Sequence, residues 1–244
     1  MEELFGIKLK LFFREFPAVF FTLFFSPMIL VIFGVAYGNE PSAIFNNLGS
    51  MDVSVPAYIG LIIAGVGLIS LPVAIAASKE RGELRRLKMT PISPMVYMLS
   101  DLIVYYLLTI VGVVILAAVG KIFYNTKYTG NIFYTFIALS VSIFAIFAMG
   151  FLLVSISKTA RIAQALGMFL TFPMMFMSGA GLPLELMPPE LLKVANFIPL
   201  KHVVTLMRGM WIGNSLLDHT KELMVLLGIF VVCSALAIKT FKWE

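Results

Sequence analysis

Long apolar runs separated by short polar stretches dominate the pattern of this chain. Six runs approach or exceed the length of about 20 mostly apolar residues that a helix needs to cross a bilayer. They cover residues 17–37, 55–77, 99–120, 132–156, 162–181 and 223–238. All six are nearly free of ionisable side chains, and Asp101 stands at the start of the third. The pattern predicts an all-α integral membrane protein with six transmembrane helices.

Residues 1–16 form a second kind of segment ahead of the first run. Apolar positions recur there at helical spacing, at Phe5, Leu9, Phe12, Phe13 and Phe16. Charged residues fall on another face, at Glu3, Lys10 and Arg14. An apolar stripe opposite a charged face is typical of an amphipathic helix lying in the membrane interface. The alternative is a basic leader that only sets the topology.

Composition supports the membrane class. Of the 244 residues, 60% are hydrophobic and 13% are charged, whereas soluble domains carry about 25% charged residues. In a membrane protein, the net charge of +5 is interpreted from the basic residues of each loop, and it does not indicate nucleic-acid binding. Cys233 is the single cysteine, which excludes a disulfide within the chain. The chain is expected to form one transmembrane domain over residues 1–244.

The Lys and Arg residues in the loops predict the orientation. With the N-terminus in the cytoplasm, twelve of the eighteen basic residues lie inside and six outside. Four of the outer six are spread through one loop of the forty residues 182–221, where their density is low. Because basic residues concentrate on the cytoplasmic side, both termini are expected in the cytoplasm of a multi-pass protein of the cell membrane.

The densest charge lies in residues 78–94, "SKERGELRRLKMTPISP", which hold five of the eighteen basic residues. Leu84 and Leu87 share a helix face with Glu80, and basic residues form a separate ridge. Thr90-Pro91 ends any helix there, and Ser93-Pro94 provides the start of the next span. These features predict a short amphipathic element on the cytoplasmic side. The simpler interpretation is a cluster of positive charge that only fixes topology.

Two stretches carry a resemblance to a known family. "KERGELRRLKMTPISPMVYMLSDLIVYYL" closely resembles the signature of ABC-2 type transport permeases, and "LPLELMPPELLKVANFIPLKHVVTLMRGMW" resembles their long outer loop. The resemblance covers nearly the whole chain. It implies that the loop 78–94, between spans two and three, holds a coupling helix that docks on a separate ATP-hydrolysing subunit. The coupling residues would be Glu80, Arg81, Gly82, Glu83, Leu84 and Leu87.

The outer loop 182–221 contains two expected helices. Pro188-Pro189 can open a short helix that runs to about Asn196. Ile198-Pro199 breaks it, and a second helical stretch can run from Leu200 to Trp211. The resemblance implies that these helices dip into the outer leaflet and cap the pathway, so Pro188, Pro189, Asn196 and Pro199 would form an outer-loop gate. The alternative is an amphipathic loop on lipid headgroups with Trp211 as its anchor.

The sequence offers no chemistry of its own for powering transport. No segment matches the phosphate-binding pattern G-x-x-x-x-G-K-[ST]. His202 and His219 are expected to be exposed loop residues, and no metal site is expected. The chain is therefore predicted not to be an enzyme and to bind no cofactor, with ATP and Mg on the partner subunit.

The leading hypothesis is the permease subunit of an ABC exporter for a hydrophobic or amphipathic cargo, such as a drug, an antimicrobial compound, a lipid or a peptide. Expected partners are an ABC ATPase subunit, a second permease copy in a homo- or heterodimer, and membrane lipid. Two alternatives stay open: a six-span substrate-binding module of an ATP-coupled vitamin uptake system, and an ion-coupled carrier. A carrier would need ionisable residues at mid-membrane, and the predicted spans show none there.

Overall fold

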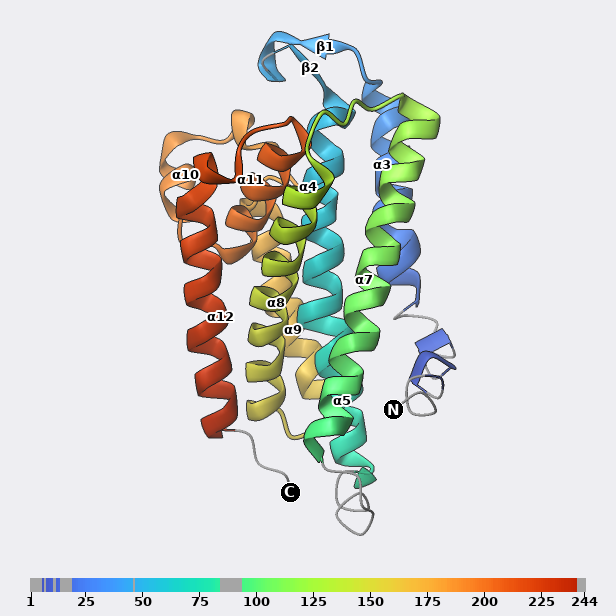
Figure 1. The fold of residues 1–244 in the computed structure, drawn as a ribbon, viewed down its shortest axis with the longest axis vertical. Coiled ribbons are helices and arrows are strands. Elements are labelled where there is room, and N and C mark those ends of the chain that lie inside the picture. The colour runs from blue at the N-terminus through green and yellow to red at the C-terminus, as the bar shows by residue number, and fades with distance from the viewer. Residues whose placement is uncertain are drawn as a thin grey trace.

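The computed structural model describes residues 6, 8–10, 12–13, 19–45, 47–83 and 94–240. These residues form an elongated bundle of long helices with a small hairpin at one end (Figure 1). The longer helices are α3 (Phe25–Tyr37), α4 (Ser50–Ala64), α5 (Leu71–Glu80), α7 (Pro94–Tyr124), α8 (Ile132–Ile156), α9 (Ala160–Met177), α11 (Pro199–Trp211) and α12 (Thr220–Thr240). The shorter ones are the π-helical η1 (Phe20–Phe24) and η3 (Gly65–Ser70), the 3-10 helices η2 (Ala43–Phe45), η4 (Leu184–Leu186) and η5 (Leu216–His219), and α10 (Pro189–Ala195).

The lengths and apolar composition of these helices suit a multi-pass membrane protein. In the described part of the chain, five helical stretches are long and apolar enough to cross a bilayer. They are Ser50–Glu80, Met98–Tyr124, Ile132–Ile156, Ala160–Met177 and Leu216–Thr240. A sixth, Thr22–Tyr37, is apolar but shorter. The all-α membrane class is thus confirmed, while the sixth span stays a prediction.

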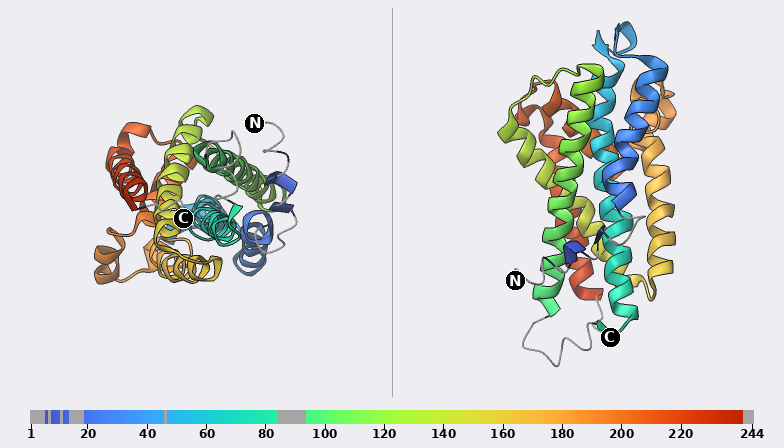
Figure 2. Two further views of the ribbon diagram at one scale, coloured as in Figure 1. Left: turned by 90° about the horizontal axis from the view of Figure 1, so that it is seen from below. Right: turned by 90° about the vertical axis from the view of Figure 1, so that its right-hand side faces the viewer.

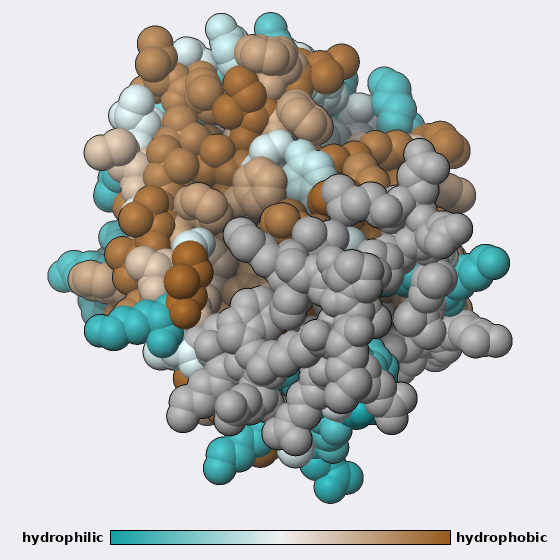
Figure 3. Space-filling model, turned by 60° about the horizontal axis from the view of Figure 1, so that its bottom comes forward, coloured by the Kyte–Doolittle hydropathy of each residue, from teal (hydrophilic) through white to brown (hydrophobic). Residues whose placement is uncertain are grey.

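Besides the helices, the described residues include one small hairpin. Strands β1 (Pro41–Ser42) and β2 (Leu48–Gly49) pair antiparallel, with Pro41 opposite Gly49. The hairpin stands beyond the helices at the top of Figure 1. We call this the hairpin end, and the opposite one, which carries the end of α5 and the start of α9, the charged end. Figure 3 shows the molecule with the charged end turned forward. The visible side of the bundle is mostly hydrophobic, and hydrophilic side chains lie around its edge.

The continuous stretch α4–η3–α5 occupies the middle of the bundle. Seen from the charged end, it is surrounded by the neighbouring spans α3, α7, α8 and α9 (Figure 2). Its buried side chains form the centre of the apolar core, with Leu30 of α3, Leu116 of α7 and Ile146 of α8 packed around it. By contrast, α12 lies at the flank and leaves most of its apolar side chains exposed. That exposure fits a lipid environment, since water would penalise so large an apolar surface.

Span α4 begins at Ser50, five residues before the predicted position, because the preceding loop caps it. The side-chain oxygen of Asn39 accepts hydrogen bonds from the backbone N–H groups of Met51 at 2.9 Å and Asp52 at 3.3 Å. The Asp52 carboxylate accepts in turn from the backbone N–H of Lys127 at 2.8 Å. Side-chain acceptors of this kind satisfy N–H groups at a helix start that have no partner within the helix. The partly polar residues 50–54 can therefore form the first turn of α4.

The π segment η3 interrupts the central span between α4 and α5. The Leu71 N–H bonds to the Val66 carbonyl, five residues back instead of four. Pro72 follows directly, and a proline has no N–H to give to the helix ladder. The other π segment, η1, precedes Pro27 in the same way. Sharp bends in helices are usual where prolines and π segments occur.

Glycines of the neighbouring spans pack on the backbone of η3. A Cβ atom at Gly150 of α8 would fall well within 3.0 Å of the Gly67 carbonyl oxygen, and one at Gly167 of α9 would be equally close to that of Leu68. Only glycine allows helix backbones to approach so closely, as is common between transmembrane helices. The central span is therefore held tightly at η3 from two sides.

The described part of the N-terminal segment is helical at residues 8–10 and 12–13. Phe12 is buried and makes an edge-to-face contact with Tyr105 of α7 at 5.9 Å between ring centroids. Leu9 also packs on the core, whereas Phe13 is exposed. The predicted stripe positions Phe5 and Phe16 lie outside the described residues. The segment is thus seated against the bundle by part of its predicted apolar stripe.

Candidate functional site

The predicted coupling segment begins where α5 ends. Glu80, its first residue of interest, directs its carboxylate to the start of α9 and accepts a hydrogen bond from the Ala160 N–H at 3.0 Å. Thr159 caps the same helix by accepting from the Ile162 N–H at 3.3 Å. A carboxylate at a helix N-terminus is favoured both by the hydrogen bond and by the helix dipole. The end of the central span is therefore fastened to the start of α9.

The chain turns directly after α5. Gly82 has a φ of +68°, a left-handed conformation that glycine adopts readily, and no described atom lies within 4 Å of the place of its Cβ. Arg81 and Glu83 form an ion pair across this turn, with 2.6 Å between Nε and Oε1. Gly82 thus provides a bend. Leu84 and Leu87, the predicted apolar contacts, lie outside the described residues.

A buried ion pair lies beside this turn and was not foreseen from the sequence. Lys8 Nζ is 2.5 Å from Asp101 Oδ1, and the two side chains are only 6% and 11% exposed. Burial lowers the pKa of Lys8, while the carboxylates of Asp101 and Glu83 oppose that shift. The pair joins the N-terminal helix to α7 next to residue 83. The charged end therefore connects the end of the central span with three other elements: α9, α7 and the N-terminal helix.

At the hairpin end, the predicted gate residues mark the ends of two helices. Pro189 and Pro199 stand at the first turns of α10 and α11, Pro188 is the N-cap of α10, and Asn196 is its C-cap. The Asn196 carbonyl lies 2.9 Å from His202 Nε2, and its side-chain oxygen accepts from Lys201 Nζ. Helices α10 and α11 thus occur within the loop 182–221, and Asn196 links them.

Helix α11 is inserted among the spans instead of lying on the surface. Of its thirteen residues, all of them described, nine are buried. Gly60 of α4 permits this approach, since a Cβ there would lie 2.8 Å from Val204 Cγ2. His202 is 3% exposed, so the expectation of an exposed histidine was wrong: the buried face of α11 includes it. Trp211 is buried as well, and an ion pair between Arg208 and Glu185 ties η4 to α11.

A cavity of about 400 Å³ lies beneath the hairpin. Its walls come from α3, the hairpin, the first turns of α4, and the loop after α9. Polar groups from Glu40, Ser54 and Tyr58 face a mostly apolar lining that includes Phe33 and Leu186. The predicted gate positions Pro188, Pro189, Asn196 and Pro199 do not line it. An amphipathic molecule is the kind of ligand that this mixture of groups can accept.

Metal chemistry has no visible basis in the residues described. Within residues 6–240 apart from the gaps stated above, no group of three or more His, Cys, Asp or Glu side chains lies close enough to hold a metal ion. His219 instead lies 3.7 Å from a Glu222 carboxylate oxygen and 3.4 Å from the Asn214 side chain. The polar groups described therefore serve helix capping, ion pairing and cavity lining.

The structure is a multi-pass helical bundle with a capped central span, an inserted loop helix and a buried ion pair at its charged end. Residues 39–239 match the family model described as ABC-2 family transporter protein, so the chain belongs to that family. It is a membrane-spanning component of the ABC transporter class.

Comparison with curated proteins identifies relatives in Escherichia coli. The chain is 23% identical over 220 residues to a probable multidrug ABC transporter permease, YbhS, of strain K12, and equally to that of strain O157:H7. The match covers 90% of this chain but 55% of each relative. The chain thus spans about half the length of the curated relatives it matches.

Proposed function

We propose that the chain is the permease subunit of an ATP-driven exporter for a hydrophobic or amphipathic cargo. The family match and a relative described as a probable multidrug permease support this proposal. The observation that carries the mechanism is the charged end, where Glu80 holds the start of α9 and the Lys8–Asp101 pair lies beside Glu83. A movement that the ATPase imposes on this end would be passed to α5, α9, α7 and the N-terminal helix together.

The proposal includes a separate ATPase subunit, which binds ATP and Mg, and a second permease copy. The contact with the ATPase would be made by Glu80, Arg81, Gly82, Glu83, Leu84 and Leu87. In the described part of this segment, Glu80, Arg81 and Glu83 already form bonds within the chain. Their contribution to a partner contact would therefore be to fix the shape of the turn as well as to touch the partner.

We also propose a sixth span and a cytoplasmic location for both termini. The η1–α3 stretch lies alongside α4 and α7, and its side chains join the same apolar core. Thr22–Tyr37 alone is short for a span. Adding the apolar residues before it gives the predicted length of residues 17–37. With six spans, the charged end faces the cytoplasm and the hairpin faces outward, as the distribution of Lys and Arg favours.

We propose that the gate lies in the loop 182–221 and that it opens at the junction between α10 and α11. Helix α11 packs against α4 and α12, so it closes part of the hairpin end of the bundle. Asn196 bonds to Lys201 and His202 at the junction of α10 and α11. Loosening this junction would let α10 and η4 move beside the cavity of about 400 Å³. That cavity would receive cargo at the outer end of the pathway.

The functional test is reconstitution. Purified chain should hydrolyse no ATP by itself, and vesicles that contain the chain with its co-purified ATPase should move a lipophilic dye only when ATP is supplied. Dye movement driven by an ion gradient without ATP would contradict the proposal and support the carrier alternative. The Lys8–Asp101 pair does not favour a carrier, because Asp101 lies near the charged end of α7 and not at its middle.

The orientation is tested by cysteine labelling after Cys233→Ser. A membrane-impermeant maleimide should label Asn131→Cys in intact cells, and Arg85→Cys only after permeabilisation. Labelling of Arg85→Cys in intact cells would overturn the proposed topology.

A further inference from the structure

A second cavity lies on another side of the bundle, toward the hairpin end. It has a volume of about 550 Å³, within the range of about 300–1,000 Å³ usual for ligand pockets. Helices α4, α7, α8 and α11 and the loop between α7 and α8 line it. None of its lining residues is shared with the cavity of about 400 Å³ beneath the hairpin. The two cavities are therefore separate.

This pocket opens sideways between α7 and α8. Its rim includes Val114 on α7 and Ile132 and Phe136 on α8, all strongly exposed, whereas Ile59 and Leu139 in its wall are buried. Exposed apolar residues on two membrane-spanning helices face hydrocarbon, not water. The mouth therefore opens onto the lipid at the hairpin end, and a hydrocarbon chain can enter without crossing a polar layer.

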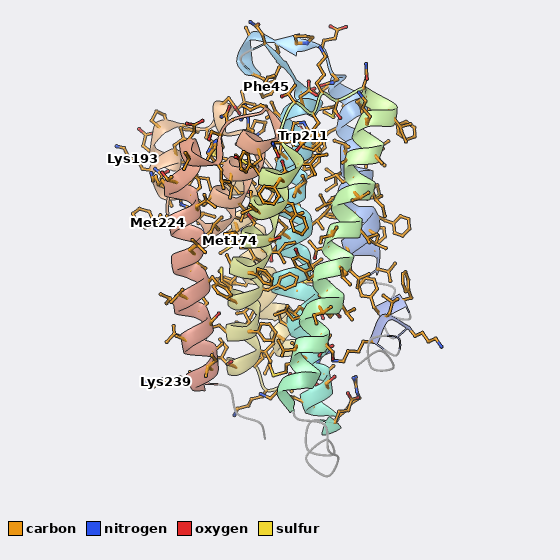
Figure 4. The ribbon with its side chains drawn as sticks, in the orientation of Figure 1. Phe45, Met174, Lys193, Trp211, Met224 and Lys239 are labelled. Atoms are coloured by element: carbon orange, nitrogen blue, oxygen red, sulfur yellow. The ribbon has the colours of Figure 1, made fainter. Side chains whose placement is uncertain are left out.

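Polar groups gather at one end of this otherwise apolar pocket. Lys121, at the end of α7, is exposed and lines the pocket, and its ammonium group donates to the Asn125 side chain at 3.2 Å. Thr126 and Trp211 also line it, and among the described residues their side-chain polar atoms, Oγ1 and Nε1, are buried without a hydrogen-bond partner. Figure 4 labels Trp211 in the hairpin-end half of the bundle.

Unpaired buried polar groups cost free energy, so each of them calls for an explanation, and a bound partner is one such explanation. An occupant with ester or phosphate oxygens would supply acceptors to these two atoms once a small rotation of their side chains exposes them, and pure hydrocarbon would not. A cation at the mouth favours an anionic group at the same end of the occupant. Tyr128 completes this end: its ring meets Trp211 edge to face at 5.1 Å, and its hydroxyl lies 2.7 Å from Thr135 Oγ1. The arrangement has a polar head region and an apolar tail region.

We propose that this pocket is a binding site for an anionic phospholipid of the leaflet at the hairpin end. One acyl chain enters between α7 and α8 and lies against Ile59 and Leu139. The phosphate group pairs with Lys121, and the ester region lies near Trp211. Because α11 carries Trp211 and also packs on α4, the bound lipid contacts the inserted helix and the central span at the same time.

The test uses Trp211 as its own reporter. Trp243 is the other tryptophan of the chain, so Trp243→Phe leaves Trp211 as the single emitter. The protein is placed in nanodiscs that contain phosphatidylcholine and a minor fraction of a lipid with brominated acyl chains, since bromine quenches tryptophan on contact. Brominated phosphatidylglycerol should quench Trp211 at a two- to fivefold lower fraction than brominated phosphatidylcholine. One partly exposed ion pair has an effect of about this size.

Two matched pairs of variants separate head from tail recognition. Lys121→Gln should remove the preference for the anionic lipid, whereas Lys127→Gln, an exposed loop lysine outside the pocket, should keep it. Ala117→Phe should fill the pocket and abolish quenching, whereas Ala118→Phe, on the exposed face of the same helix, should leave it unchanged.

Equal quenching by the two lipids, a preference that survives Lys121→Gln, or strong quenching in Ala117→Phe would each overturn the proposal. Lys121→Gln keeps the test decisive if the bulky variant does not fold. The measurement needs neither ATP nor a partner subunit. It therefore succeeds or fails independently of the exporter proposal.

Discussion

Adding a single methyl group at Gly150 tests how tightly the central span is held. The new Cβ of Gly150→Ala would lie well within 3.0 Å of the Gly67 carbonyl oxygen, a separation that real Cβ atoms essentially never show, and 3.2 Å from Pro72 Cγ. One obstacle is backbone and the other is a proline ring, so neither can rotate away. Helix α8 must therefore move away from η3.

Overpacking of this kind costs about 1–3 kcal/mol. For a chain of this size, 1 kcal/mol lowers the melting temperature by about 2–4 °C. A middle value of about 2 kcal/mol therefore predicts that Gly150→Ala melts about 4–8 °C below wild type in detergent. Thermal melting can be followed by the loss of the monodisperse peak in size-exclusion chromatography.

Gly228→Ala is the matched control. Gly228 lies within α12, and among the described residues no atom is within 4 Å of the place of its Cβ. Alanine is favoured over glycine inside a helix by about 0.5–1 kcal/mol, so this variant should melt at or above the wild-type temperature. If Gly150→Ala melts as high as Gly228→Ala, the two helices are not held in the close contact described, and the reasoning fails.

Three further substitutions test the polar contacts. Glu80→Ala removes one of the two side-chain acceptors at the start of α9, while Thr159 remains, and should cost about 1 kcal/mol of unfolding free energy, seen as a lower melting temperature; an unchanged value would show that the Ala160 contact contributes nothing. Asp101→Ala leaves Lys8 buried without its carboxylate and should cost about 3 kcal/mol, whereas the double change Lys8→Met, Asp101→Leu should recover most of that loss. Strictly additive losses in that double-mutant cycle would contradict a direct pair. Asn39→Ala removes the acceptor at the start of α4 and should cost about 1–2 kcal/mol, measured by melting; hydrogen exchange should rise at residues 51–52, and unchanged exchange there would refute the capping role.

The length of the apolar runs was sufficient to predict most of the long helices. The predicted 132–156 coincides with α8, and the predicted spans near 99–120 and 223–238 lie within α7 and α12. Pro189 marks the start of α10, and the predicted stretch from Leu200 to Trp211 differs from α11 by one residue at its start. These features depend on local composition and on the fixed φ of proline, both of which are visible in a single sequence.

Features that depend on contacts between distant residues could not be predicted in the same way. Polar Ser50 and Asp52 suggested a loop, yet Asn39 and the loop after α7 satisfy the helix start there. Lys8 and Asp101 are far apart in the sequence, with the first two apolar runs between them. Nothing in the sequence indicates that they form a pair. His202 was expected to be exposed because it lies in a predicted loop, but it falls on the buried face of α11. Each of these errors arises from a partner elsewhere in the fold.

The π segment η3 has a mechanical consequence for α5. The central span packs closely on α11 through α4 and on α8 and α9 at η3, and α5 continues from there for ten residues to Glu80. We regard α5 as an arm whose pivot lies at η3. At about 1.5 Å per residue, the arm is about 15 Å long. A rotation of about 10° at a proline-linked pivot would swing its tip by about 3 Å. Because Glu80 at the tip is bonded to the start of α9, this rotation of α5 would displace α9 as well. Neither α5 nor α9 would need to change its length.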